Sequence, residues 1–244
     1  MDTANPVDNN ALLNKASSIV AITAHEFKTP LSTITAVVDL IAAKLQADGL
    51  MNSFYEKNLS RITSEIFSLN NMLDEMLTIN NILSGSIETK KMVVAVESKL
   101  HTIKEQFQSF SRNDKILQIN ITGTPVPIFV SPVQLTHILT NLISNAFKYS
   151  RENDPVIHLH YKEKELEISI ADDGIGIPEE DLPHLFEPYY RGSNTGGISG
   201  SGLGLAIVKT FVTANDGNIT VHSKPGEGTV FTLTFRYPDS KTNS

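Results

Sequence analysis

Apolar and small residues recur at alternating steps of three and four along residues 13–45. This spacing predicts a helix with a single apolar stripe, in the heptad form that paired helices use, and it does not fit a strand. Asp48 and Gly49 interrupt the pattern, which resumes over residues 55–83. The sequence therefore predicts two long helices joined by a short loop, which form an antiparallel hairpin. The stripe comprises Leu13, Ala16, Val20, Thr23, Phe27, Leu31, Ile34, Val38, Ile41 and Leu45, then Tyr55, Leu59, Ile62, Ile66, Leu69, Leu73, Met76, the polar Asn80, and Leu83.

A hairpin with so long an apolar stripe has too little surface of its own to cover it. Pairing with a second copy of the chain into a four-helix bundle would cover the stripe, and we favour this interpretation. The alternative is a hairpin folded against the C-terminal half of the same chain. We therefore expect a homodimer.

The pattern changes after residues 84–86, whose Ser-Gly-Ser composition marks a linker. We place the domains at residues 1–86 and 87–244. Because strands and helices mix in the second domain, we expect an α+β sandwich with helices on one face of the sheet, not a doubly wound parallel fold. The predicted strands are 92–96, 116–121, 128–130, 156–161, 166–171, 219–223 and 229–235, and the predicted helices are 98–111, 132–149 and 205–214.

The composition narrows the class of protein. With 244 residues, 40% of them hydrophobic, the chain can bury a sizeable core, and without cysteine it has no disulfide or thiolate chemistry. A net charge of −7 argues against nucleic acid or an anionic membrane as a partner. No segment approaches the roughly 18–20 apolar residues of a membrane span, and the N-terminus lacks the order of a signal peptide. We expect a cytoplasmic protein without membrane contact, or the cytoplasmic part of a longer membrane-anchored or multidomain protein.

One histidine in the first predicted helix has neighbours suited to chemistry. His25 is followed at once by Glu26 and five residues later by Pro30. Imidazole is nucleophilic near neutral pH, and an adjacent carboxylate can orient the ring and accept its proton. Pro30 has no N–H, so it frees the carbonyl of Glu26 and can bend the helix. His25 lies off the apolar stripe, so we expect its ring to reach solvent. The alternative is a surface histidine beside a helix kink.

Residues of the predicted helix at 132–149 place two amides and an ammonium on one face. Asn141, Asn145 and Lys148 are spaced by four and three residues. Amide oxygens and an ammonium suit a hydrated Mg²⁺ and its phosphates, because magnesium prefers hard oxygen ligands and keeps several waters. An ordinary polar helix face is the alternative.

An acidic turn follows the strand predicted at 166–171. Asp172 at the end of this strand can accept a hydrogen bond from an exocyclic amine such as that of adenine. Gly174 and Gly176 allow a sharp turn and a close approach of the backbone. A tight acidic turn without a ligand is the alternative.

A glycine-rich stretch at 196–204 leads directly into the helix predicted at 205–214. Free N–H groups and the helix dipole favour an anion such as phosphate at this position. The stretch matches neither the P-loop nor the dinucleotide fingerprint. Aromatic residues at 186–190 precede it and can anchor a lid, and Arg191 could meet a γ-phosphate. Surface aromatics that only hold a loop are the alternative. These blocks converge on nucleotide binding.

These blocks, in this order and at these separations, resemble the sensor histidine kinases of two-component signalling. In that family a dimerisation and phosphoacceptor hairpin precedes an ATP-binding domain of the gyrase/Hsp90/histidine kinase/MutL type, also called the Bergerat fold. The resemblance extends from about Leu12 to Tyr237. Its motifs are the phosphoacceptor box at His25, the asparagine box at 141–148, the first glycine box at 172–176, the aromatic box at Phe186, the second glycine box at 200–204, and Gly228-Thr229.

The resemblance implies an enzyme that uses ATP and Mg²⁺ to phosphorylate itself on His25. Glu26 would be the acid/base partner, and Thr29 would position a water for dephosphorylating a response regulator, whose receiver domain is the implied partner. Asn145 would ligate Mg²⁺, and Asp172 would bind the adenine amine. The other implied nucleotide contacts are Asn141, Lys148, Tyr149, Gly174, Gly176, Ile177, Tyr190, Arg191, Ser199, Gly200, Ser201, Gly202, Leu203, Gly204 and Thr229.

Two other functions stay open. A different ATPase of the same nucleotide-binding type would hydrolyse ATP to drive a clamp, but such proteins lack a phosphoacceptor hairpin. A silent scaffold that dimerises and only binds nucleotide would be expected to have lost Asn145, Asp172 or a glycine box, and the sequence has all of them. The sequence therefore favours the kinase.

Overall fold

The computed structural model describes residues 6–83, 89–110, 115–198 and 200–238. It divides the chain into two compact units, Met1–Ile87 and Glu88–Ser244, which are described separately below. The predicted linker at 84–86 and the predicted boundary between the domains lie outside the described residues.

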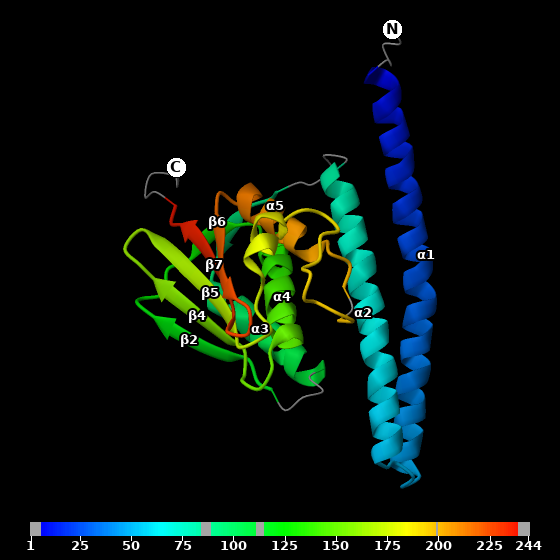
Figure 1. The fold of residues 1–244 in the computed structure, drawn as a ribbon. Coiled ribbons are helices and arrows are strands. Elements are labelled where there is room, and N and C mark those ends of the chain that lie inside the picture. The colour runs from blue at the N-terminus through cyan, green and yellow to red at the C-terminus, as the bar shows by residue number, and fades with distance from the viewer. Residues whose placement is uncertain (1–5, 84–88, 111–114, 199, 239–244) are drawn as a thin grey trace. The chain divides into compact units, whose positions relative to one another are not determined.

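The first unit is a helical hairpin, as the heptad pattern predicts (Figure 1). Gly49, in the loop between the helices, has a positive φ of 67° that allows the chain to reverse. Asn52 caps the second helix, because its side chain accepts hydrogen bonds from the backbone N–H groups of Phe54 at 3.0 Å and Tyr55 at 3.2 Å. The helices are α1 (Pro6–Ala47) and α2 (Ser53–Leu83).

The single predicted stripe divides into two in the hairpin. Ala24, Val38, Ile66 and Ile79 are buried between the helices. The prediction placed Thr23 on the stripe, but Thr23 is exposed and the neighbouring Ala24 is 2% exposed. The correction has a geometric cause: the apolar face with which α1 packs against α2 is wider than one heptad seam.

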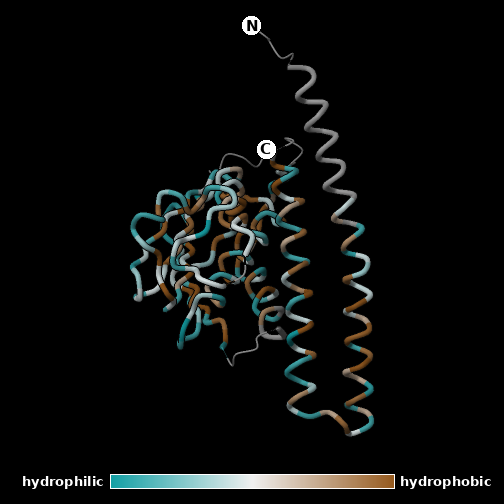
Figure 2. The backbone as a smooth tube through the Cα atoms, turned by 45° about the vertical axis from the view of Figure 1, so that its right-hand side comes forward, coloured by the Kyte–Doolittle hydropathy of each residue, from teal (hydrophilic) through white to brown (hydrophobic). Residues whose placement is uncertain are grey.

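The second stripe is the part of the predicted seam that the hairpin leaves exposed. Its members follow one another at steps of seven residues in each helix, and Figure 2 shows the apolar positions along both helices. The side chains predicted at Leu13, Ala16, Val20 and Leu83 lie outside the described ones. The exposed members are Phe27, Ile34 and Ile41 in α1 and Tyr55, Ile62, Leu69 and Met76 in α2.

The second unit contains a five-stranded sheet in the order β2-β4-β5-β7-β6. Only the β2–β4 pair is parallel, and the other three pairs are antiparallel. A separate two-stranded sheet pairs β1 with β3. The strands are β1 (Met92–Val94), β2 (Gln118–Thr122), β3 (Ile128–Val130), β4 (Val156–Tyr161), β5 (Glu165–Asp172), β6 (Asn218–Lys224) and β7 (Gly228–Arg236).

Helices cover one face of this sheet (Figure 1). Burial alternates along the strands, so that Ile157, Leu159 and Tyr161 of β4 are buried while His158 and His160 are exposed. This is the expected α+β sandwich. The helices are α3 (Val96–Phe110), α4 (Pro132–Tyr149) and α5 (Gly204–Ala214), with the 3₁₀ helix η1 (Glu179–His184).

Two local predictions for this unit need correction. The strand predicted at 92–96 ends at Val94, and Val96 already belongs to α3. Both valines are buried, so their alternation fits a strand, but β3 offers partners only as far as Val94. The short helix η1 was not predicted, because its acidic and proline-containing sequence has no apolar periodicity. Among the described residues, no helix is long and apolar enough to cross a membrane.

Candidate active site

Helix α4 presents the predicted amide and ammonium face. Ser131 caps the helix and Pro132 occupies its first turn, where the missing N–H costs nothing. The opposite face packs into the core through Leu135, Ile138, Leu139, Leu142, Ile143 and Ala146. Asn141, Asn145 and Lys148 are half-buried. The apolar face therefore orients all three side chains toward the rim of the core.

Asp172 lies at the end of β5, where it pairs with Thr229 of β7. Its Oδ1 accepts a hydrogen bond from the backbone N–H of Gly174 at 2.8 Å. Burial raises the pKa of Asp172 to about 6, although backbone hydrogen bonds from Gly174 and Thr229 partly offset the rise. A carboxylate with spare acceptor capacity in a desolvated position suits recognition of an amine.

The glycines around Asp172 are required by close backbone contacts. A Cβ on Gly174 would lie 2.3 Å from the carbonyl oxygen of Tyr149 and 2.5 Å from Oδ1 of Asp172. Gly176 has a φ of +67°, and its Cβ would lie 1.8 Å from the carbonyl oxygen of Lys224. The first contact brings the turn after β5 against the C-terminal end of α4, and the second brings it against the end of β6.

A hydroxyl pair supports the same turn from the other side. The hydroxyl of Ser223 accepts a hydrogen bond from the backbone N–H of Ile177 at 2.9 Å and lies 2.8 Å from the hydroxyl of Thr229. Thr229 is 7% exposed. The predicted residues Ile177 and Thr229 therefore meet through Ser223, which the sequence did not single out.

Asp173 ties the same turn to the segment after α4. Partial burial alone would raise its pKa, but hydrogen bonds outweigh this effect and hold the pKa well below its usual range. The role was missed because Asp173 looks like a second member of an acidic turn, and its donors lie in the segment after α4, 20 to 23 residues earlier. The donors to its carboxylate are the hydroxyl of Ser150, the backbone N–H groups of Arg151, Glu152 and Asn153, and the amide of Asn153.

Tyr149 is influenced by two positive charges. The ammonium of Lys148 lies 5.0 Å from the centre of the Tyr149 ring, and a Cβ on Gly200 would lie 2.8 Å from that ammonium. Burial raises the pKa of the Tyr149 hydroxyl, and the nearby positive charge of Arg191 partly offsets that rise. The asparagine box and the second glycine box therefore meet at Lys148, and the positive charges of Lys148 and Arg191 suit this place to phosphates.

The second glycine box leads into α5. Leu203 precedes the helix without a side-chain cap, and its backbone N–H donates to the hydroxyl of Ser201 at 3.1 Å. The first turn of α5 contains no acidic residue. Gly202 has a φ of +75° and packs against the backbone of Tyr189. The expected contact residue Ser199 lies outside the described residues.

The hydroxyl of Tyr190, a predicted nucleotide contact, is hydrogen-bonded within its own segment. Its hydroxyl donates to Oδ1 of Asp181 at 2.6 Å, and this hydrogen bond raises the pKa of Tyr190 to about 12. Arg191 donates from its guanidinium to the carbonyl oxygen of Ile198. The segment is thus folded on itself around Asp181.

The described part of the hairpin shows the surroundings of the expected phosphoacceptor. α1 continues as a helix through His25 and Pro30. The side chain of His25 is not among the described ones, so the expectation that its ring reaches solvent stays a prediction. Glu26 and Thr29 are exposed. Lys28 forms an ion pair with Asp74 of α2 at 2.5 Å, which joins the two helices beside this site.

Two family models match the chain. Residues 15–85 match the His Kinase A (phospho-acceptor) domain, and residues 130–239 match the Histidine kinase-, DNA gyrase B-, and HSP90-like ATPase. The first match contains His25, and the second contains every residue predicted to contact nucleotide.

Curated relatives match over most of the chain. The aerobic respiration control sensor protein ArcB of Escherichia coli K12 is 28% identical over 229 residues, which is 91% of this chain and 29% of ArcB. The sensor histidine kinase WalK of Bacillus subtilis is 28% identical over 227 residues, which is 91% of this chain and 37% of WalK. The chain thus spans about a third of the length of these relatives.

Solved structures share the fold. Full-length ShkA in complex with AMPPNP has a TM-score of 0.63 and 22% identity, over 91% of this chain and 46% of ShkA. The Acinetobacter baumannii histidine kinase AdeS has a TM-score of 0.58 and 20% identity, over 88% of this chain and 98% of that one.

Proposed function

The chain belongs to the sensor histidine kinases, and from that premise we propose that it transfers the γ-phosphoryl group of ATP to His25 and then to an aspartate of a response regulator. The observation that carries the proposal is the meeting of Lys148 and Gly200 beside Tyr149, with Asp172 on the turn that contacts the same tyrosine. One chain thus combines a site for adenine and phosphates with a phosphoacceptor helix.

The nucleotide would bind with its two ends in different surroundings. The Asp172 carboxylate would accept a hydrogen bond from the adenine amine, and Gly174, Gly176, Ile177 and Thr229 would border the base. Lys148, Tyr149, Arg191 and the stretch 200–204 would bind the phosphates, together with the N-terminus of α5.

Mg²⁺ fits the residues present. Within the described residues, no group of three or more His, Cys, Asp or Glu side chains could hold a metal ion by itself. The half-buried amides of Asn141 and Asn145 therefore suit an ion that ATP phosphates and water also ligate. We assign Asn145 as its protein ligand. The bound ion would neutralise phosphate charge.

The transfer needs little covalent help from the protein. A ring nitrogen of His25 would attack the γ-phosphorus, the bond from that phosphorus to the bridging oxygen would break, and ADP would leave. Glu26 would accept the proton from the other ring nitrogen. Thr29 would position a water for phosphatase activity toward the response regulator. Donor and acceptor belong to different units, so the linker at 84–86 must let the units meet.

The functional form would be a homodimer. The exposed stripe described above repeats at the heptad spacing in both helices of the hairpin. A second copy would bury both halves of the stripe in a four-helix bundle, because two hairpins present the same apolar surface to each other.

The deciding experiment is labelling of the full chain with γ-labelled ATP and Mg²⁺. We expect an acid-labile, base-stable phosphate on the wild type and none on His25→Ala, which should still bind ATP. Labelling that survives in His25→Ala would contradict the proposal. Release of inorganic phosphate without protein labelling would indicate a clamp-type ATPase, and nucleotide binding without either reaction would indicate a silent scaffold.

A further inference from the structure

Asp181 is a buried carboxylate that the proposed reaction does not use. It lies in η1 and is 3% exposed, whereas its neighbours Glu179 and Glu180 are exposed. A buried carboxylate is costly unless hydrogen bonds compensate it. Asp181 therefore needs hydrogen-bond donors, and all of its described side-chain donors lie in one segment.

Both oxygens of Asp181 hold the segment that contains Arg191. Oδ1 accepts from the hydroxyl of Tyr190 at 2.6 Å. Oδ2 accepts from the backbone N–H of Ser193 at 2.8 Å and from its hydroxyl at 3.0 Å. The hydrogen bond from Tyr190, followed by those from Ser193, lowers the pKa of Asp181. Arg191 lies between the two anchoring residues.

The same segment is fixed at further points. The amide of Asn194 donates to the carbonyl oxygen of Gly176 at 2.9 Å, and the backbone N–H of Tyr189 donates to the carbonyl oxygen of Gly202 at 2.9 Å. In contrast, a Cβ on Gly196 or Gly197 would meet no atom within 4 Å. The base of this loop is held on both sides while its tip has open space.

We propose that Asp181 is a positioning residue that holds the segment 189–194 so that Arg191 faces the terminal phosphates of bound ATP, with Tyr190 acting through Asp181 instead of touching the nucleotide. This inference rests on the proposed function, because it takes ATP as the ligand. Holding residues 190 and 193 fixes the backbone on both sides of Arg191, whose guanidinium donates to the carbonyl oxygen of Ile198 in the same loop. The closed base would favour a triphosphate over shorter nucleotides.

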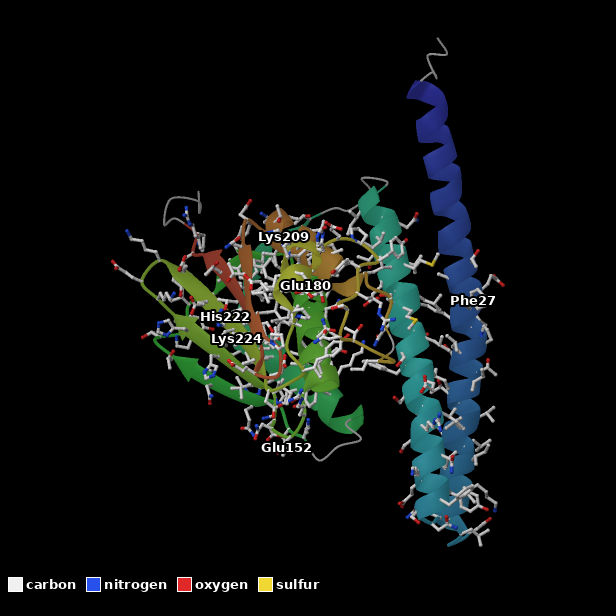
Figure 3. The ribbon with its side chains drawn as sticks, in the orientation of Figure 1. Phe27, Glu152, Glu180, Lys209, His222 and Lys224 are labelled. Carbon is white, nitrogen blue, oxygen red and sulfur yellow. The ribbon has the colours of Figure 1, made fainter. Side chains whose placement is uncertain are left out.

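The test compares binding of ATP, ADP and adenosine to the full chain in the presence of Mg²⁺. We expect Asp181→Asn to weaken ATP binding about 10-fold and Tyr190→Phe about 3-fold, with adenosine binding changed by less than about 2-fold. The effects should not add in the double variant, because both remove the same contact. Glu180, labelled in Figure 3, is an exposed neighbour of Asp181. Glu180→Gln also removes one negative charge, and this variant should bind ATP as tightly as the wild type.

Trypsin cleavage after Arg191 gives a second measurement that does not need activity. ATP should protect this bond in the wild type and protect it several-fold less in Tyr190→Phe. Equal ATP affinity and protection in wild type and Tyr190→Phe would overturn the inference, as would an equal loss for all three ligands. A wild type that binds ATP without phosphorylating His25 would overturn only the proposed function, and a wild type that binds no nucleotide would overturn both.

Discussion

The hairpin and the ATP-binding unit bury their apolar residues in different ways. In the second unit, sheet and helices enclose a core in which side chains such as Leu139, Ile157 and Leu233 are 0% exposed. In the hairpin, Phe27 is 56% exposed and Leu69 48%, and Figure 3 labels Phe27 on α1. The second unit thus has an enclosed core of its own, whereas the hairpin leaves an apolar face exposed, which the proposed homodimer would cover.

This difference has an energetic consequence. Full burial of an aliphatic or aromatic side chain stabilises a protein by roughly 1.5–3 kcal/mol. Burial of a stripe of seven such residues would therefore strongly favour association of two hairpins. The stability of the hairpin should therefore depend on protein concentration, while that of the ATP-binding unit should not.

The largest expected effect is on the association of hairpins. Ile62→Glu places a charge on the exposed stripe, which two symmetric copies would bury twice, so the dimer should weaken at least about 100-fold. Sedimentation velocity over a range of concentrations measures this. Leu40→Glu is the matched control, because Leu40 is 70% exposed and lies off the stripe. A dimer that tolerates Ile62→Glu would mean that another surface holds the copies together.

An intermediate effect concerns pH and belongs to the ATP-binding unit alone. The pKa of Asp172 is raised to about 6 by burial, so the carboxylate is largely protonated at pH 5 and largely ionised at pH 7. If the ionised form binds the adenine amine, ATP affinity should rise about 10-fold between these values. Calorimetric titration at several pH values measures this, with hairpin dimerisation as an internal control. A flat affinity profile would show that Asp172 does not bind the amine as a carboxylate.

Asp172 should also affect stability, with the opposite sign. Because folding raises this pKa, the folded state binds the proton more tightly, and the stabilising contribution at low pH is lost as pH rises through about 4 to 6. Asp172→Asn should therefore raise the melting temperature at pH 7 while weakening ATP binding.

The smallest effect is expected for a polar contact of the hairpin, in contrast to a buried polar contact of the second unit. Lys28 and Asp74 are 39% and 47% exposed, so Lys28→Met should lower the free energy of unfolding by less than about 1 kcal/mol. Asn215 is buried between α4 and α5, where it accepts from the backbone of Ser131 and donates to Gln134, each at 2.7 Å. Asn215→Ala should cost about 2 kcal/mol. Urea unfolding with hydrogen exchange measures both, and an equal cost would remove the contrast.

Much of the fold could be predicted because the relevant patterns are local. Helix α4 begins at Pro132 and ends at Tyr149, as its apolar periodicity and first-turn proline predict. β3 and β4 also have the predicted bounds, because the pattern of apolar residues along each strand is local. Motif order along the chain indicated the family, which the domain matches support.

Other features were not predictable because they depend on which segments meet. Among the acidic residues at 179–181, only Asp181 is buried, and nothing in the local sequence distinguishes it. Asp173, in the turn after β5, accepts its hydrogen bonds from the segment after α4. Tyr190 was assigned to the nucleotide from motif position, but its hydroxyl has a different partner.

The sequence by itself determined the two kinds of unit, the helix that carries His25 and the set of blocks that can bind ATP, because periodicity, turn chemistry and motif order are properties of neighbouring residues. Only the tertiary structure decided which apolar positions the hairpin covers and which it leaves exposed. It also decided that Lys148 and Gly200 meet beside Tyr149, and that Asp181 binds Tyr190 and Ser193 on either side of Arg191. The reason is physical: burial and hydrogen bonding depend on distances between segments, and these exist only once the chain has packed.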